Sequence, residues 1–99
     1  MIKHIVMWQI KATDGQSKEE NVRAIKALID GLKGKVPGLL HIEGGIDFSA
    51  SETSGDVVLY AEFESRAALD GYQAHPAHLK MAPFIADRRT ERRIVDYEI

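Results

Sequence analysis

The segment "IKHIVMWQI", residues 2–10, decides the fold of this 99-residue chain. It is rich in residues that favour β-structure, and its length suits one strand. Side chains of a strand alternate between the two faces of a sheet. One face would carry Ile2, His4, Val6, Trp8 and Ile10, and the other Lys3, Ile5, Met7 and Gln9. Because both faces have large apolar groups at the strand centre, we expect cover on both sides of the sheet.

Two helical regions follow, each with a recognisable start. Ser17 with Glu20 three residues later is a capping-box pattern, and apolar residues then recur at helical spacing until about Gly34. A second helix is predicted after Ser65. It is interrupted at Pro76, because a proline suits the first position of a new helix better than the interior of an old one.

The remaining segments are predicted as strands at residues 39–48, 56–64 and 92–99, with a bulge at the Gly44-Gly45 pair. The order is therefore β-α-β-β-α-β. We predict a single domain over residues 1–99, of the α+β class, with a ferredoxin-like antiparallel sheet and both helices on one face.

This arrangement leaves one face of the sheet without cover. The strands at 2–10 and 56–64 are apolar on both faces, and soluble monomers rarely expose an apolar surface of that size. We therefore expect a homodimer in which two sheets pack face to face.

The composition limits the partners and the chemistry. The formal net charge is −2, so we predict neither nucleic acid nor a membrane as partner. The basic run at residues 88–93 contains Glu91 and is predicted as a solvated helix end and an exposed strand start. The absence of cysteine excludes a thiol nucleophile and thiolate metal ligands. The first apolar run is too short for a membrane span and lacks a cleavage region, so we predict a cytoplasmic location.

The stretch "GYQAHPAHLK", residues 71–80, holds the best candidates for chemistry. His78 would lie in the first turn of the helix that starts at Pro76, where the helix dipole disfavours the imidazolium form. A neutral histidine can act as a general base. Tyr72, on the preceding turn, could polarise a carbonyl, and His4 could line the far wall of the same cavity. The alternative is that these are core residues, each with one satisfied hydrogen bond.

Other candidates have weaker patterns. His75 is predicted to cap the helix that starts at Pro76, and this proline separates it from His78. Two ligands across a break make a poor metal site, so we predict no metal and no cofactor. Trp8 is either a core residue or a ligand wall. Asp96 and Glu98 show no obvious partner in the sequence.

Several stretches together resemble the stress-responsive dimeric α+β barrel (Dabb) family. They are "IKHIVMWQIK" at the start, "VPGLLHIEGGIDFS" in the middle, "FES" with "ALDGYQAHPAHLK" after it, and the closing "VDYEI". The resemblance covers essentially the whole chain. It implies a ferredoxin-like monomer and a homodimer whose sheets form a barrel, and it does not imply one activity.

The olivetolic acid cyclases of plants, one class within this family, are similar at useful positions. They close a linear polyketide by aldol condensation, and the resemblance matches their histidine and tyrosine to His78 and Tyr72 and a first-strand histidine to His4. A further pocket histidine is matched by Asp56, and a pocket-shaping tyrosine by Ile29, so the resemblance is incomplete.

We therefore predict a Dabb protein of undefined activity that binds a small apolar carbonyl compound between helices and sheet. His78, Tyr72 and His4 are the candidate catalytic residues, and Trp8, His75 and Ile29 are the candidate ligand-binding residues. If the protein is an enzyme, it would be a histidine-based, proton-abstracting cyclase or lyase without a cofactor. The first alternative is a non-enzymatic, stress-related or ligand-sequestering homodimer. The second is a polyketide cyclase-like lyase.

Overall fold

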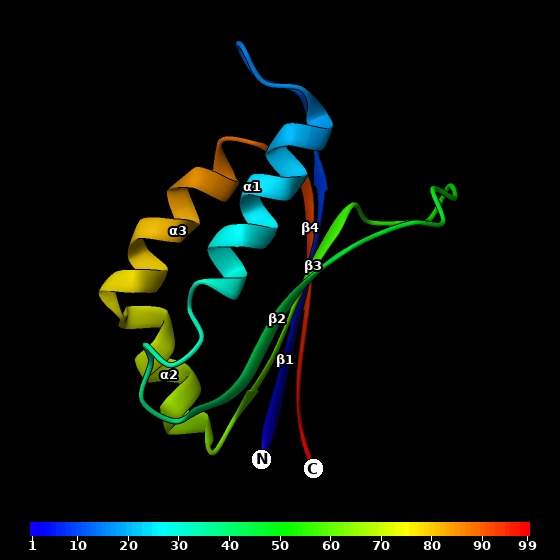
Figure 1. Cartoon of the computed structure of the whole chain (residues 1–99). Coiled ribbons are helices and arrows are strands. Elements are labelled where there is room, and N and C mark those ends of the chain that lie inside the picture. Colours follow the sequence, from blue (N-terminus) through cyan, green and yellow to red (C-terminus); the bar gives the residue numbers. More distant parts are fainter.

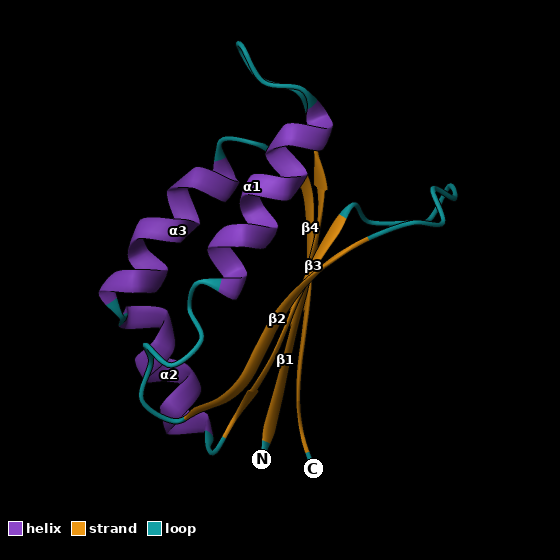
Figure 2. Ribbon diagram, viewed as in Figure 1, coloured by secondary structure: helices purple, strands orange, loops and turns teal.

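The computed structural model describes residues 1–99 and contains four strands and three helices. In chain order they are β1 (Ile2–Ile10), α1 (Lys18–Asp30), β2 (Leu39–Ile46), β3 (Val57–Phe63), α2 (Arg66–Ala74), α3 (Pro76–Ala86) and β4 (Arg89–Glu98). The strands form one antiparallel sheet in the order β2-β3-β1-β4, and the helices form a layer on one side of it (Figures 1 and 2). This confirms the predicted ferredoxin-like α+β fold, with the second helix divided in two.

The helix-facing side of the sheet carries the core. In β1, the five side chains predicted to share a face are all buried, as are alternate side chains of β3. Ile25 and Ile29 of α1 and Phe63 of β3 have no exposed surface. Burial of these apolar groups between the two layers supplies the main stabilisation of the fold.

The predicted helix starts are present. Ser17 and Glu20 form both bonds of the capping box at α1, and the Ser65 hydroxyl accepts from the amide of Ala68 at α2. His75 joins the last two helices: its backbone N–H donates to Tyr72 O at the end of α2, and its Nδ1 accepts from the Ala77 amide at 3.0 Å. The predicted capping role of His75 is thus confirmed.

The predicted bulge at Gly44-Gly45 is wrong. The pairing of β2 with β3 continues regularly through both glycines, and the register shift lies between Leu39 and His41. Gly44 is needed for a different reason, since a Cβ there would lie 3.2 Å from the backbone Cα of Lys26 in α1. The glycine allows the helix backbone to approach the strand closely.

Two element boundaries also differ from the prediction. α1 ends at Asp30 rather than near Gly34, and the Asp30 carboxylate accepts from the Gly44 N–H at 2.8 Å. Because β2 is an edge strand, this bond gives a partner to an amide that faces away from the sheet. β4 starts at Arg89, three residues before the predicted position.

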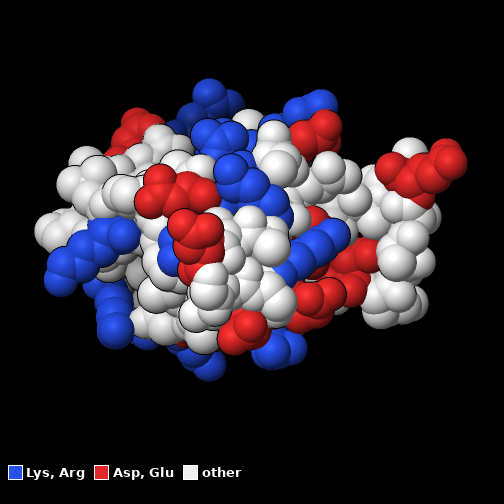
Figure 3. Space-filling view, turned by 90° about the horizontal axis from the view of Figure 1, so that it is seen from above, with Lys and Arg blue, Asp and Glu red and all other residues white.

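The opposite face of the sheet has no cover, as the pattern predicts (Figure 1). Every residue of β4 is exposed. The bare face, defined here as the side of the sheet away from the helices, carries at its centre the apolar side chains of Ile5, Met7, Val58, Tyr60, Val95 and Tyr97. None of the helices has the length and apolar content needed to cross a membrane. Figure 3 shows acidic and basic side chains interspersed in the view from above.

Candidate functional site

A cavity of about 260 Å³ lies between the sheet and the last two helices. β1, β3 and β4 supply one wall, and α2 and α3 supply the other. Its lining residues are His4, Val6, Trp8, Leu59, Tyr72, Gln73, His78, Met81, Ala82, Ile85, Ala86, Arg89 and Arg92. We refer to it as the histidine cavity. Most of its wall is apolar, and a few polar groups converge in it, which is the usual composition of a small-molecule site.

The structure brings four of the six candidate residues together in this cavity, namely His4, Trp8, Tyr72 and His78. It does not bring in the other two. His75 lies at the joint between α2 and α3, where its side chain caps α3. Ile29 is enclosed in the core on α1 and does not line the cavity.

Tyr72 occupies the centre of an aromatic cluster. Its ring centroid lies 4.7 Å from that of His78, 6.0 Å from that of His4 and 5.1 Å from that of Phe63. The residue is 1% exposed. Such edge-to-face and tilted contacts hold the ring in one orientation. Tyr72 therefore lies next to both cavity histidines.

The hydroxyl of Tyr72 faces the cavity. It makes no hydrogen bond to the protein. Every fully buried polar side-chain atom of the chain, in contrast, has a hydrogen-bond partner. The Oη atom must then reach the accessible wall of the cavity. Burial raises the pKa of Tyr72 to about 12, against a smaller opposing effect of the Arg92 charge. The phenol therefore remains protonated at neutral pH and is available as a donor.

His78 is held with one ring nitrogen toward the backbone. Its Nδ1 lies 3.1 Å from the carbonyl oxygen of Gln73. A carbonyl only accepts, so Nδ1 carries the hydrogen and the lone pair of the neutral ring is on Nε2. Burial lowers the pKa of His78, while the bond to Gln73 opposes this, and the nearby His4 and Arg92 add smaller lowering effects. The sequence argument used the helix dipole to keep His78 neutral; burial is the main cause in the structure.

His4 has a partner that the sequence did not reveal. Its Nδ1 lies 2.5 Å from Oδ1 of Asp96, the residue directly opposite it on β4. The bond orients the imidazole and leaves Nε2 free of that carboxylate. Glu98 also has a partner, Arg66. The sequence shows no obvious partner for either acid, because these partners depend on the fold and not on nearby sequence.

Two arginines of the cavity were also missed as site residues. Arg92 lies at the start of the exposed strand, as predicted, and Arg89 lies on the same strand rather than at a helix end; both line the histidine cavity. The alternation of side chains along β4 indicates that Arg92 and Asp96, which are four residues apart, lie on the same face of the sheet. Which face that is depends on the pairing with β1.

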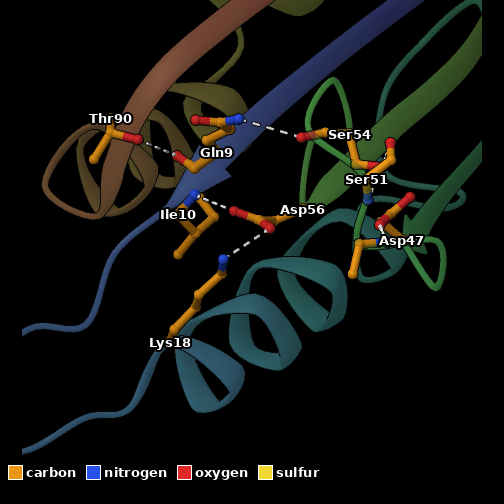
Figure 4. Close-up of polar contacts among 9 residues, drawn as sticks. Gln9, Ile10, Lys18, Asp47, Ser51, Ser54, Asp56 and Thr90 are labelled. Atoms are coloured by element: carbon orange, nitrogen blue, oxygen red, sulfur yellow. Dashed lines mark hydrogen bonds and ion pairs between the residues drawn. The ribbon is translucent and has the colours of Figure 1, made fainter.

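A second, larger hollow lies where β1 ends and α1 begins. Its volume is about 570 Å³, and Figure 4 shows its polar contacts. Asp56 lies here and not in the histidine cavity. It accepts from the Ile10 amide at 2.7 Å and pairs with Lys18 at 3.1 Å. The side-chain amide of Gln9 donates to the carbonyl oxygen of Ser54, and the Thr90 hydroxyl donates to the carbonyl oxygen of Gln9. We refer to it as the Asp56 hollow.

No group of three or more His, Asp or Glu side chains in the structure is placed to hold a metal ion. The chemistry available to the histidine cavity from its own residues is therefore that of a protonated phenol, two imidazoles and two guanidinium groups. The phenol can donate a hydrogen bond to a carbonyl oxygen. An imidazole next to it can accept a proton from the carbon adjacent to that carbonyl.

The one-sided helix layer, the antiparallel sheet and the cavity between them define a ferredoxin-like α+β protein with an internal site. The chain belongs to the Dabb family, the stress responsive A/B barrel domain, whose model matches residues 2–99. This confirms the resemblance seen in the sequence.

Solved structures agree with the fold. A dimeric protein of unknown function and ferredoxin-like fold from Bacteroides fragilis is 29% identical, with a TM-score of 0.83 over 99% of this chain and 95% of that one. A dimeric ferredoxin-like protein of unknown function from Jannaschia sp. is 25% identical, with a TM-score of 0.77 over 99% of this chain and 98% of that one.

A hydroxynitrile lyase from Passiflora edulis is 19% identical, with a TM-score of 0.79 over 99% of this chain and 92% of that one. Comparison with curated proteins finds no match. Since the same fold occurs in an enzyme and in proteins without a known reaction, the fold alone does not define the activity of this chain.

Proposed function

We propose that this Dabb protein binds a small, largely apolar carbonyl compound in the histidine cavity and removes a proton from the carbon next to the carbonyl. The observation that carries the proposal is the position of the Tyr72 hydroxyl, which faces an apolar cavity without a protein partner. The neighbouring His78 has its lone pair on Nε2 because Nδ1 is bonded to the backbone. The cytoplasmic location predicted from the sequence is part of the proposal.

The step needs only groups of this chain. The Tyr72 O–H donates to the carbonyl oxygen. The C–H bond next to the carbonyl breaks and its proton moves to Nε2 of His78. Its electron pair forms the C=C bond of an enolate, while the π pair of the carbonyl moves onto the oxygen. His4, oriented by Asp96, lies with its ring centroid 6.0 Å from that of Tyr72 and would support the charged oxygen. Such a site suits cyclases and lyases that proceed through an enolate.

The experiment is deuterium exchange in deuterium oxide, with methyl hexyl ketone as the probe. We expect wild-type protein to speed deuterium uptake next to the carbonyl, as followed by mass spectrometry. His78→Asn should reduce the rate at least about a hundredfold, the lower end of the contribution of general-base catalysis. His41→Asn is the matched control, because His41 is an exposed histidine outside the histidine cavity; sedimentation equilibrium checks that the variant keeps the assembly of wild type.

Two outcomes would contradict the proposal. If wild type does not speed exchange but still binds the ketone, the protein sequesters the ligand without turning it over, which is the alternative predicted from the sequence. If His78→Asn and His41→Asn have equal effects, His78 is not the base. Circular dichroism of both variants separates these results from a loss of folding.

We also propose that the protein is a homodimer formed through the bare face. The supporting features are the apolar side chains at its centre and Phe48, which is 97% exposed on the arm between β2 and β3. The structural relatives from Bacteroides fragilis and Jannaschia are described as dimeric. Two sheets that pack in this way would give the barrel for which the family is named.

Sedimentation equilibrium at micromolar concentration tests the dimer. We expect twice the chain mass for wild type and for Lys33→Glu, a change on the exposed turn after α1. Met7→Glu places a charge at the centre of the bare face, where Met7 is 42% exposed, and should give a monomer. A wild-type monomer would contradict this part of the proposal.

A further inference from the structure

We infer that the ligand of the histidine cavity carries a carboxylate, which Arg92 binds with help from Arg89, so that the ligand class is a small oxo acid. The inference rests on the proposed function and specifies its substrate. It follows from three observations: the side of β4 on which these arginines lie, their lack of protein partners, and the shape of the cavity.

The register between β1 and β4 places Arg92 on the cavity side. Arg92 is directly opposite Trp8, a buried residue on the helix-facing side of β1. Residues directly opposite each other in antiparallel strands extend to the same side of the sheet. Arg89 is opposite Ile10, which is also buried, and both arginines line the cavity. Arg93, in contrast, is opposite Met7 on the bare face.

The two cavity arginines have no carboxylate partner. None of the ion pairs in the structure includes Arg89 or Arg92, and neither side chain donates a hydrogen bond within the protein. Two other arginines do have protein partners. Arg66 pairs with Glu98, and Arg88 donates to Asn21 and to the carbonyl of Phe84. Asp96, the acid nearest in sequence on the same side of β4, is bonded to His4. Two solvent-exposed guanidinium groups at the wall of the cavity are therefore free to bind an anion.

A carboxylate satisfies this arrangement best. The guanidinium group offers parallel N–H donors that match the two oxygens of a carboxylate. Arg92 is also close enough for its charge to lower the pKa of both Tyr72 and His78. A ligand carboxylate on Arg92 would thus lie near the groups proposed to act on its ketone.

The cavity size limits the rest of the ligand. Drug-sized ligands occupy pockets of roughly 300–1,000 Å³, and the histidine cavity is just below that range at about 260 Å³. Val6, Leu59, Met81 and Ile85 give it an apolar wall. A short alkyl chain fits this wall, with the acid at the arginines and the ketone at Tyr72.

The experiment compares γ-oxooctanoate with its methyl ester by isothermal titration calorimetry on the full-length protein. These probes differ only at the acid end, where the ester carries a methyl group and no charge. We expect wild type to bind the acid at least about tenfold more tightly than the ester, equal to about 1.4 kcal/mol. Arg92→Gln should remove this preference, and Arg92→Lys should restore only part of it, because an ammonium group lacks the planar fork.

Arg23→Gln is the matched control, since it removes the same charge from the Asp56 hollow. It should keep the preference for the acid. The inference is overturned if the ester binds as well as the acid, if neither probe binds, or if Arg92→Gln keeps the preference. Tighter binding of octyl phosphate than of the acid would also overturn it, in favour of a phosphate ligand.

These outcomes are separable from those of the proposed function. Binding of the acid through Arg92 without deuterium exchange would support the ligand class and contradict the proton transfer. Exchange into methyl hexyl ketone that does not change in Arg92→Gln, together with equal binding of acid and ester, would support the proton transfer and contradict the ligand class.

Discussion

The histidine cavity and the Asp56 hollow lie on one molecule and differ in how their polar groups are used. The Asp56 hollow is the larger, at about 570 Å³ against about 260 Å³, yet its carboxylate is already bonded to Lys18 and to the Ile10 amide. In the smaller cavity, the Tyr72 hydroxyl and two guanidinium groups have no protein partner. A buried residue whose polar group has no partner, such as Tyr72, distinguishes a candidate site from a structural hollow better than volume does.

The largest expected effect comes from Tyr72→Phe. This change removes only the hydroxyl and keeps the packed ring. Because the hydroxyl makes no protein hydrogen bond, we expect the free energy of unfolding in urea to change little. The rate of deuterium exchange should fall on the order of a hundredfold, as for loss of one oxyanion donor. A large loss of stability with unchanged exchange would show that Tyr72 is only a core residue.

The reverse pattern is expected for Asp56→Ala. The change leaves the Ile10 amide and Lys18 without their shared partner, which should cost about 2 kcal/mol of unfolding free energy. Exchange in the histidine cavity should stay at the wild-type rate. Chemical denaturation and the exchange assay measure the two effects on the same sample. A fall in exchange without a fall in stability would contradict our division between the two regions.

The pH dependence should depend on His78. Burial lowers its pKa from the ordinary value of 6.5, so the folded protein favours the neutral ring more than the unfolded chain does. Exchange should therefore be on a plateau at pH 7 and fall only when the pH drops through the lowered pKa. The contribution of His78 to the free energy of unfolding is present above pH 6.5. It is lost as the pH falls from 6.5 through the lowered pKa. An NMR titration of the ring that gives a pKa above 6.5 would contradict both statements.

The smallest effect is expected for Ser51→Ala in the Asp56 hollow. The Ser51 hydroxyl contacts that of Ser54 on an exposed loop. Surface changes of this kind usually alter stability by less than about 0.5 kcal/mol. We expect no change in exchange or in ligand binding. A measurable loss of binding would mean that the Asp56 hollow is a site in its own right.

The sequence predicted what depends on local spacing. The alternation of residues 2–10, the Ser17–Glu20 pair and the proline after His75 each predicted a feature that the structure contains. The position of Tyr72 on the turn before the break at Pro76 also placed it near His78.

The features that were missed depend on contacts between distant segments. Asp96 and Arg92 become site residues only through the register of β4 on β1. The role of Gly44 depends on the approach of α1 to β2. No pattern within one segment contains that information, so the pairing of segments had to come from the structure.

The close approach at Gly44 affects how the helix layer lies on the sheet. A Cβ at this position would lie 3.1 Å from the Lys26 Cγ and 3.2 Å from the Lys26 Cα. Because backbone atoms cannot move aside as a flexible side chain does, α1 would have to shift away from β2. The position of one helix over the sheet thus depends on a side chain that is absent.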